Sequence, residues 1–325
     1  MRRHEFIAGF ASTMTALPLV ALAQQADDPQ KIGYVWMGAP GDRDEILAGL
    51  RRGLEDRGYV LGRNLVLEER YANSNVAQVP QLIAELLAKK VDVLVTPGTA
   101  TSRAAQRATS TVPIVVMSAD PVGNGLVESL AHPGANITGL SSVASDYSAK
   151  WLQLLIEAAP KVRRVAVLWN PDNPAMVQEL AQMNDAARAL TLHLTALPAR
   201  GPELEASLAA IVPASVDGFV VCDDPLLITI MPRLIVLAAD RSLPAIYGYS
   251  SAANQGGLMS YSIDFFDWGR QAGGYIDRIL KGARPAEQPI EQATKFVLKI
   301  NIKTAKALDL MIPPTLLAVA DEVVE

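Results

Sequence analysis

The sequence predicts an α/β protein built from two doubly wound parallel-sheet lobes that are joined by a hinge. Short apolar runs alternate with amphipathic helical segments, which is the pattern of βαβ units whose sheet is buried on both faces. The alternation occurs twice, near residues 30–140 and 145–250. The chain has 325 residues, 50% of them hydrophobic, which is enough material for two separate cores.

The first half contains strands and helices in alternation. The segment from Asp44 to Arg57 carries apolar residues at helical spacing, and Gly58 follows it as a C-cap. The five residues from Val91 to Val95 are a continuous apolar strand. The expected strands cover 31–37, 64–71, 91–95 and 113–117, and the expected helices cover 44–57, 76–90 and 101–108.

The second half repeats this rhythm after a connection rich in serine and glycine, Gly139 to Ser148, which we expect to act as a hinge. The expected strands cover 165–169, 191–197, 218–222 and 244–248, and the expected helices cover 150–159, 176–190, 202–211 and 230–241.

The tail has too few elements to bury a core of its own. It contains expected strands at 257–263 and 296–300 and expected helices at 266–280 and 303–308, the latter capped by Asn301. We therefore expect it to complete the two lobes. The expected division is 30–142 plus about 257–288 for the first lobe and 143–256 plus about 289–325 for the second.

Residues 1–23 have the three parts of a secretory signal peptide. Arg2 and Arg3 form a positive head, an apolar run without charge extends from Phe6 to Leu22, and small residues precede a cleavage site after Ala23. The run is short and interrupted for a membrane span. We expect export to the periplasm, by either the general secretory or the twin-arginine route. An uncleaved N-terminal anchor is the alternative.

Composition and motifs exclude several classes of function. The formal net charge is −5 and the basic pairs are scattered, which argues against nucleic acid as a partner. A single cysteine, Cys222, and three histidines make no recognisable metal site, and we expect a buried thiol. The nucleophile elbow, the phosphate-binding loop and the zinc-protease motif are missing. The glycine pattern that begins at Gly123 has Glu128 in place of its third glycine, which favours an ordinary turn.

Small polar residues cluster just after the expected strands, where open parallel sheets bind ligands. The amides of Gly98, Thr99 and Ala100 lead into a helix and suit a carboxylate, with the Thr99 hydroxyl as a further donor. Asp120 or Asp224 suits an ammonium group. The candidate ligand-binding residues are Gly38, Gly98, Thr99, Ala100, Asp120, Asn170, Asp172, Asp224 and Tyr247.

The strand ends also predict an aromatic wall made by Trp36, Tyr247 and Tyr249. We therefore favour an amino acid or an aromatic acid as the ligand. Asp172, Asn173 and Asp223 leave a sugar open. For each of these loop residues the alternative role is that of a turn former, and for each aromatic residue it is core packing.

The mature chain resembles the exported substrate-binding proteins of ABC transporters related to the tryptophan-binding type, in the type I periplasmic-binding-protein fold. The resemblance is carried by stretches such as IGYVWMG, DVLVTPGTATSRAAQRAT, SADPVGNGLVESLAHPGANITG and RVAVLWNPDNP. It implies two lobes that close on one small ligand. It also implies ligand contacts at Thr99 and Asp120, and at Asn170 and Asp224 in the more variable second lobe.

The leading hypothesis is a solute-binding protein that works as a monomer, needs neither cofactor nor metal, and delivers its ligand to an ABC transporter permease. The alternative is an exported receptor domain that presents its ligand to a membrane sensor. A third hypothesis is an exported hydrolase that uses aspartate carboxylates. A repressor of similar fold is disfavoured because a signal sequence stands where a DNA-binding segment would be.

Overall fold

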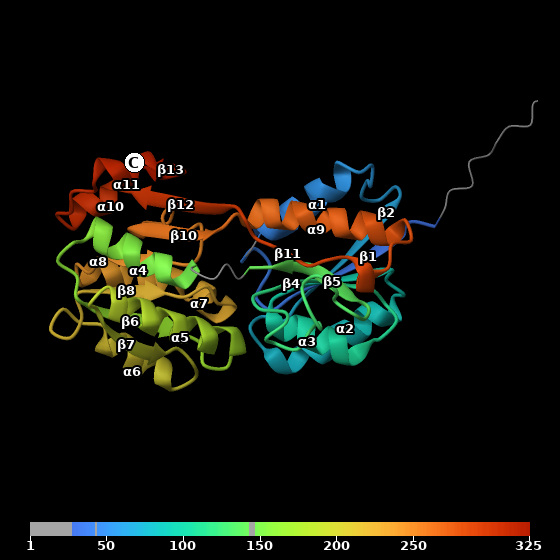
Figure 1. Ribbon diagram of the computed structural model, residues 1–325, viewed down its shortest axis with the longest axis horizontal. Helices are drawn as coiled ribbons and strands as arrows, with labels where there is room; N and C mark the ends of the chain where they lie inside the picture. Colours follow the sequence, from blue (N-terminus) through green and yellow to red (C-terminus); the bar gives the residue numbers. More distant parts are fainter. Residues whose placement is uncertain (1–27, 43, 143–146) are drawn as a thin grey trace, which may run out of the picture.

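The computed structural model describes residues 28–42, 44–142 and 147–325, which form two α/β lobes placed side by side (Figure 1). The described part of the chain contains no helix that is both long enough and apolar enough to cross a membrane. The expected fold class, two doubly wound lobes, is confirmed. The expected signal peptide lies outside the described residues.

The first lobe is a six-stranded sheet with helices on both faces, in the strand order β11-β5-β4-β3-β1-β2. Its strands are β1 (Gln30–Trp36), β2 (Leu65–Tyr71), β3 (Val93–Pro97), β4 (Ile114–Ser118), β5 (Ile137–Ser141) and β11 (Glu291–Gln292). Its helices are α1 (Asp44–Glu55), α2 (Val79–Ala88), α3 (Thr99–Ala108) and α9 (Phe265–Leu280), with short 3-10 turns η1 (Val76–Gln78) and η2 (Pro285–Glu287).

The second lobe is a seven-stranded sheet in the order β13-β12-β10-β9-β8-β6-β7, in which only the β10–β12 pair is antiparallel. Its strands are β6 (Arg164–Trp169), β7 (His193–Pro198), β8 (Gly218–Val221), β9 (Ala245–Tyr247), β10 (Met259–Ile263), β12 (Phe296–Asn301) and β13 (Glu322–Val324). Its helices are α4 (Tyr147–Ala158), α5 (Pro174–Ala189), α6 (Glu203–Ala210), α7 (Pro225–Thr229), α8 (Met231–Asp240), α10 (Ile302–Ala307) and α11 (Pro314–Ala318).

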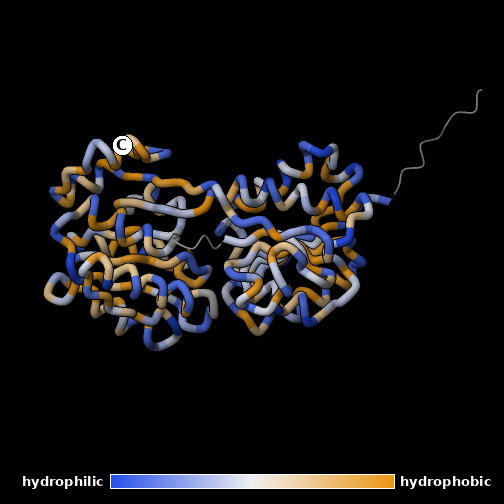
Figure 2. The backbone as a smooth tube through the Cα atoms, in the orientation of Figure 1, coloured by the Kyte–Doolittle hydropathy of each residue, from blue (hydrophilic) through white to orange (hydrophobic). Residues whose placement is uncertain are grey.

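The central strands are mostly apolar and are buried along their length because helices cover both faces of each sheet. In β3 and β4 every residue is buried, and β8 is buried throughout. Hydrophobic segments therefore run through the interior of each lobe, and hydrophilic ones lie mainly on the helices and loops around it (Figure 2). Cys222, directly after β8, is buried as expected, and burial raises the pKa of its thiol.

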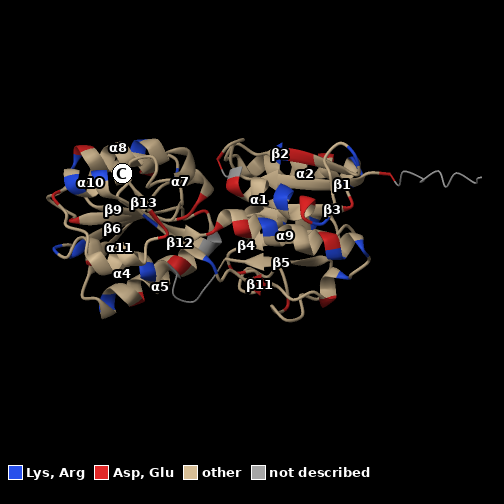
Figure 3. Cartoon of the chain, turned by 90° about the horizontal axis from the view of Figure 1, so that it is seen from above, with Lys and Arg blue, Asp and Glu red and all other residues tan. Residues whose placement is uncertain are grey.

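Charged residues do not gather into one patch in the view of Figure 3, where Lys and Arg are interspersed with Asp and Glu over both lobes. Many of these side chains pair locally, as Arg164 does with Asp217 at 2.6 Å and Arg233 with Glu205 at 2.6 Å. This distribution differs from the continuous basic surface that nucleic acid requires.

The division of the chain between the lobes differs from the expected one at two places. Residues from 257 onward were expected in the first lobe, but β10 pairs with β9, Met259 opposite Ile246. Residues from 289 onward were expected in the second lobe, but β11 pairs with β5, Glu291 opposite Leu140. Apolar patterning identifies a strand without identifying the sheet edge that it joins, so these segments were misassigned.

The expected connection from Gly139 to Ser148 is shorter than predicted, because β5 extends to Ser141. Gly139 lies within the sheet, where a Cβ would stand 2.0 Å from the carbonyl oxygen of Val116. The chain passes between the lobes at three places, between β5 and α4, between β10 and α9, and between β11 and β12. The last two passages are joined where Lys295 Nζ lies 2.6 Å from Asp264 Oδ2.

Helix α9 returns from the C-terminal part of the chain to lie along α1 (Figure 1). Each of the two helices has a pair of glycines at the contact, Gly49 and Gly53 on α1 and Gly269 and Gly273 on α9. A Cβ on Gly49 would lie 2.0 Å from the carbonyl oxygen of Phe266, and a Cβ on Gly53 would lie 2.2 Å from that of Arg270. From the other side, a Cβ on Gly269 would lie 2.1 Å from the Ile46 carbonyl oxygen. The backbones of the two helices therefore touch.

We predict that Gly49→Ala lowers the free energy of unfolding by about 1–3 kcal/mol, because the added methyl group forces two packed helices apart. An alanine at an unconstrained helical position would instead raise it, by about 0.5–1 kcal/mol. Urea unfolding measures the difference. Ala48→Leu, at an exposed position on the same helix, is the matched control and should change little. A stabilised Gly49→Ala variant would contradict the proposed contact.

Candidate ligand-binding site

Both sheets have the doubly wound strand order. The strands that follow β1 and β6 are added first on one side and then on the other, so the order reverses between β1 and β3 in the first lobe and between β6 and β8 in the second. This position is called the switch point. Ligands bind outside the carboxyl ends of the strands at this switch point. In the first lobe those ends are Trp36 on β1 and Gly98 after β3. In the second lobe they are Asn170 after β6 and Asp223 after β8. The two switch points face each other across the space between the lobes.

A cavity of about 580 Å³, including its opening to solvent, lies between these strand ends and is called the inner cavity here. It is lined by Trp36, Ile46, Pro97, Gly98, Thr99, Met117, Ala119, Ser142, Asn173, Met176, Glu179, Asp223, Pro225, Phe265 and Trp268.

The first lobe presents the N-terminus of α3 to this cavity. Gly98 is the N-cap residue with φ 95°, a conformation that favours glycine, and it provides no capping side chain. Thr99 Oγ1 is held by Ser118 Oγ at 2.9 Å, and Thr101 Oγ1 donates to the Pro97 carbonyl at 2.6 Å. The backbone N–H groups of the first turn are thus left for an anionic group, which the helix dipole also favours.

The second lobe contributes a loop that is fixed by the buried Asp224. Its carboxylate caps α7 by accepting the Leu226 N–H at 2.9 Å. It also accepts hydrogen bonds from Asn170 Nδ2 at 3.1 Å and Asn173 Nδ2 at 2.8 Å. These three bonds tie the loops after β6 and β8 together. Asp224 therefore organises the second-lobe wall of the site.

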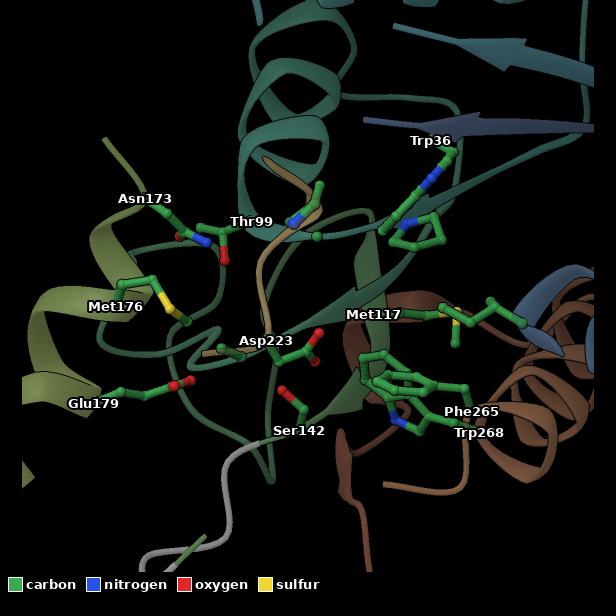
Figure 4. Close-up of a pocket in the computed structure, with 15 residues that line it drawn as sticks. Trp36, Thr99, Met117, Ser142, Asn173, Met176, Glu179, Asp223, Phe265 and Trp268 are labelled. Atoms are coloured by element: carbon green, nitrogen blue, oxygen red, sulfur yellow. The ribbon is translucent and has the colours of Figure 1, made fainter. Parts of the chain in front are cut away.

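In contrast to Asp224, the side chain of the preceding residue, Asp223, extends into the inner cavity. Its carboxylate lies near the centre of the view in Figure 4, between the α5 side chains of the second lobe and the aromatic rings of the first. The loop that carries Asp223 passes close to Gly248. A Cβ at residue 248 would stand 2.8 Å from the Asp223 nitrogen, so this close approach requires a glycine. Asp223 is the acidic group best placed for a ligand cation.

Aromatic and thioether side chains form the first-lobe wall. Phe265 and Trp268 come from the first turn of α9, with ring centroids 6.2 Å apart and planes inclined by 63°. Trp36 and Met117 continue this wall from β1 and β4 (Figure 4). The indole nitrogen of Trp268 is enclosed and has no hydrogen-bond partner among the described residues. The wall can hold a planar apolar group.

A second, outer cavity continues from the first and shares Gly98 and Thr99 with it. At its rim Arg200 pairs with Asp172, with 2.9 Å between Nη1 and Oδ1. Asp172 is exposed, so this pair forms the solvent side of the site. Four further ligand-binding residues predicted from the sequence line this outer cavity: Ala100, Asn170, Asp172 and Asp224.

Three predicted residues line neither cavity. The Asp120 carboxylate accepts the Gly123 N–H of its own turn at 2.8 Å. Tyr247 is fully buried, and its ring packs on Phe219 in the second-lobe core at a centroid distance of 6.3 Å. The carbonyl of Gly38 accepts the Asn73 N–H at 3.1 Å. In each case local bonding or core packing uses the group that was expected to meet the ligand.

Tyr249, expected in the aromatic wall, joins the lobes instead. Its hydroxyl donates a hydrogen bond to the backbone carbonyl of Asp42 in the first lobe. Next to it, Ser250 Oγ donates to Glu45 Oε1 at 3.0 Å. These two contacts link the loop after β9 to the start of α1.

The sequence reasoning missed several cavity residues. Asp223 was considered only for a sugar, and Glu179, Phe265 and Trp268 were not considered as site residues. The adjacent pair Asp223 and Asp224 was a signal for the first of these, since neighbouring residues after a strand point in different directions. Phe265 and Trp268 offered no comparable signal: their helix was expected in the first lobe, but its apolar spacing does not show which residues meet the cavity.

The acidic residues that line the inner cavity are Glu179 and Asp223. Of its described lining residues, none is histidine, cysteine, lysine or arginine. No group of His, Cys, Asp and Glu that could hold a metal ion occurs within the described ranges. The arrangement is one for binding: an anion position, an acid and an aromatic wall.

Comparison with known proteins places this geometry in a family. The family described as "ABC transporter substrate binding protein" matches residues 37–324. A curated relative from Clostridioides difficile, named tyrosine-binding protein, is 26% identical over 271 residues, which are 82% of this chain and 77% of the relative.

Two solved structures share the fold. A conserved domain protein from Vibrio cholerae has a TM-score of 0.85 at 28% identity, covering 91% of this chain and all of its own. An ABC domain in complex with L-Trp from Streptococcus pneumonia has a TM-score of 0.84 at 24% identity, with the same coverage. The chain therefore belongs to the ABC transporter substrate-binding proteins and has the type I periplasmic-binding-protein fold.

Proposed function

We propose that this protein captures an aromatic amino acid between its lobes and delivers it to the membrane permease of an ABC transporter. The inner cavity carries the proposal. It combines an uncapped helix N-terminus, an acidic side chain and an aromatic wall at facing switch points. An α-amino acid with a planar side chain has the three complementary groups.

In the proposed complex the ligand's carboxylate accepts hydrogen bonds from the N–H groups at the start of α3, around Thr99 and Ala100. Its ammonium group pairs with Asp223. Its ring lies against Trp36, Phe265 and Trp268, whose faces favour contact with a planar apolar group. The relatives support this choice of ligand, since one is named for tyrosine and another was solved with L-Trp.

The ligand contacts come from both lobes, so binding favours the arrangement in which they are close. Thr99 and the aromatic wall belong to the first lobe, whereas Asp223 belongs to the second. A ligand shifts an open–closed equilibrium by its differential affinity for the two states. The contacts of Tyr249 and Ser250 with the first lobe further stabilise the closed arrangement.

Export, a monomeric state and delivery to a permease are parts of the same proposal. The apolar N-terminal segment supports export, and membership of the family supports a permease as the partner. A receptor domain that hands its ligand to a membrane sensor would use the same binding physics. Binding without turnover is expected, because the groups that face the ligand position suit recognition rather than nucleophilic attack.

A thermal-shift screen tests the ligand class. L-Tryptophan, L-tyrosine and L-phenylalanine should raise the melting temperature, since a ligand at 100 times its Kd adds about 2.7 kcal/mol to stability. Indole and neutral sugars are the comparison compounds. Stabilisation by a neutral sugar and by none of the carboxylates would overturn the proposal, and conversion of the bound compound would identify an enzyme.

We predict that Asp223→Asn weakens binding of the stabilising amino acid at least about 30-fold, because it removes the partner of a desolvated ammonium group. Isothermal titration calorimetry measures the change. Asp120→Asn is the matched control: Asp120 bonds to its own turn, so its Kd should stay near that of the wild type. A Kd raised by Asp120→Asn and left unchanged by Asp223→Asn would return the ammonium contact to Asp120.

We predict that Tyr249→Phe weakens binding by about 2- to 10-fold, the value of one hydrogen bond, because it destabilises the closed arrangement. Phenylalanine keeps the packing of the ring, which is buried. The radius of gyration from small-angle scattering should decrease on saturation with ligand, and less completely in the variant. An unchanged Kd would show that the bond to Asp42 has no part in closure.

A further inference from the structure

The carboxyl group of Glu179 projects from α5 into the inner cavity, toward Asp223 and Ser142 (Figure 4). The residue as a whole is half-buried, but its Oε2 atom is enclosed. This atom has no hydrogen-bond partner among the described residues. A carboxyl oxygen in this position is costly unless something else completes its bonding. The cavity that it faces is the place from which a partner would come.

The groups that face Glu179 are acidic or neutral. Cys222, Asp223 and Asp224 follow β8, and burial keeps the Cys222 thiol neutral. The described lining of the inner cavity contains no basic side chain. Burial, and next the charge of Asp224, raise the pKa of Glu179 to about 8. At neutral pH, with no cation opposite, the carboxyl group is mostly protonated.

We propose that Glu179 is a second acidic contact for the ligand's cationic group and that it releases a proton to solvent when the ligand binds. This inference rests on the proposed function, since it takes an ammonium-bearing amino acid as the ligand. The neutral carboxyl and the ammonium ion become a carboxylate–ammonium pair, and the one proton lost from Glu179 goes to the buffer. A nearby cation favours the ionised carboxylate, which is why the proton leaves.

The sign of the pH dependence follows from this proton. Below pH 8 binding must remove the proton from Glu179, so affinity rises with pH by about tenfold per unit up to that point. If Glu179 instead donated its proton to a ligand oxygen, no proton would be released, and affinity would stay nearly constant up to about pH 8 and fall above it. The pH dependence therefore separates a contact with a cation from a contact with an acceptor.

The test is calorimetric titration of L-tryptophan into the full mature chain at pH 6, 7 and 8, in buffers of different ionisation enthalpy. The wild type should release close to one proton per ligand at pH 7. Glu179→Gln should release about one proton fewer. It should bind about as the wild type does at pH 6 and at least about tenfold more weakly at pH 8. Asp185→Asn, an exposed acid on the same helix that pairs with Arg188, is the control and should match the wild type.

Two outcomes would overturn the inference. Binding of L-tryptophan without proton release, or a Glu179→Gln variant with the wild-type pH profile, removes the role of Glu179 and leaves the proposed function intact. Failure of both L-tryptophan and L-tyrosine to bind removes the proposed function and this inference together. If Glu179→Gln does not fold, tryptamine and indole-3-propionate replace it as probes of the wild type. Tryptamine, which has the ammonium group, should release the proton, and indole-3-propionate should not.

Discussion

The contact between α1 and α9 is the constraint on which the binding site depends. Glycines at positions 49, 53, 269 and 273 let the two backbones touch, and no other residue fits at these positions without moving one helix. Glycine inside a helix costs about 0.5–1 kcal/mol relative to alanine, so the close approach must return more than that. It brings Phe265 and Trp268 from the distant C-terminal part of the chain to the cavity wall.

The same fold explains why the two halves of the site differ in character. Each doubly wound sheet provides one switch point, and the loops there carry whatever the ligand requires. The first lobe supplies a helix N-terminus and aromatic rings, which suit a carboxylate and a planar group. The second lobe supplies acids, with Asp224 holding the loop so that Asp223 faces the cavity. A ligand that satisfies both must lie between them, and this couples binding to the relative position of the lobes.

The electrostatics of the cavity favour a zwitterion over a simple anion. Acids stand on the second-lobe side, while the anion position is made of backbone N–H groups and a helix dipole rather than of lysine or arginine. In the proposed complex, oriented dipoles at one end would recognise a carboxylate, and acidic groups at the other would recognise an ammonium. Glu179 adds an acid whose charge depends on what lies opposite it.

The sequence by itself determined the α/β class, the two lobes and most strands, because apolar periodicity is a local property that burial imposes on each segment. It also placed the Gly98–Ala100 loop and Asp224 among the candidate ligand contacts at strand ends, whereas it considered Asp223 only for a sugar. Only the tertiary structure decided which sheet β10 and β11 join, and that Tyr247 packs in the core while Asp223 faces the cavity. Edge pairing, side-chain direction at a strand end and the α1–α9 contact depend on residues far apart in the chain. The energies that select them are interactions between segments, which no single segment encodes.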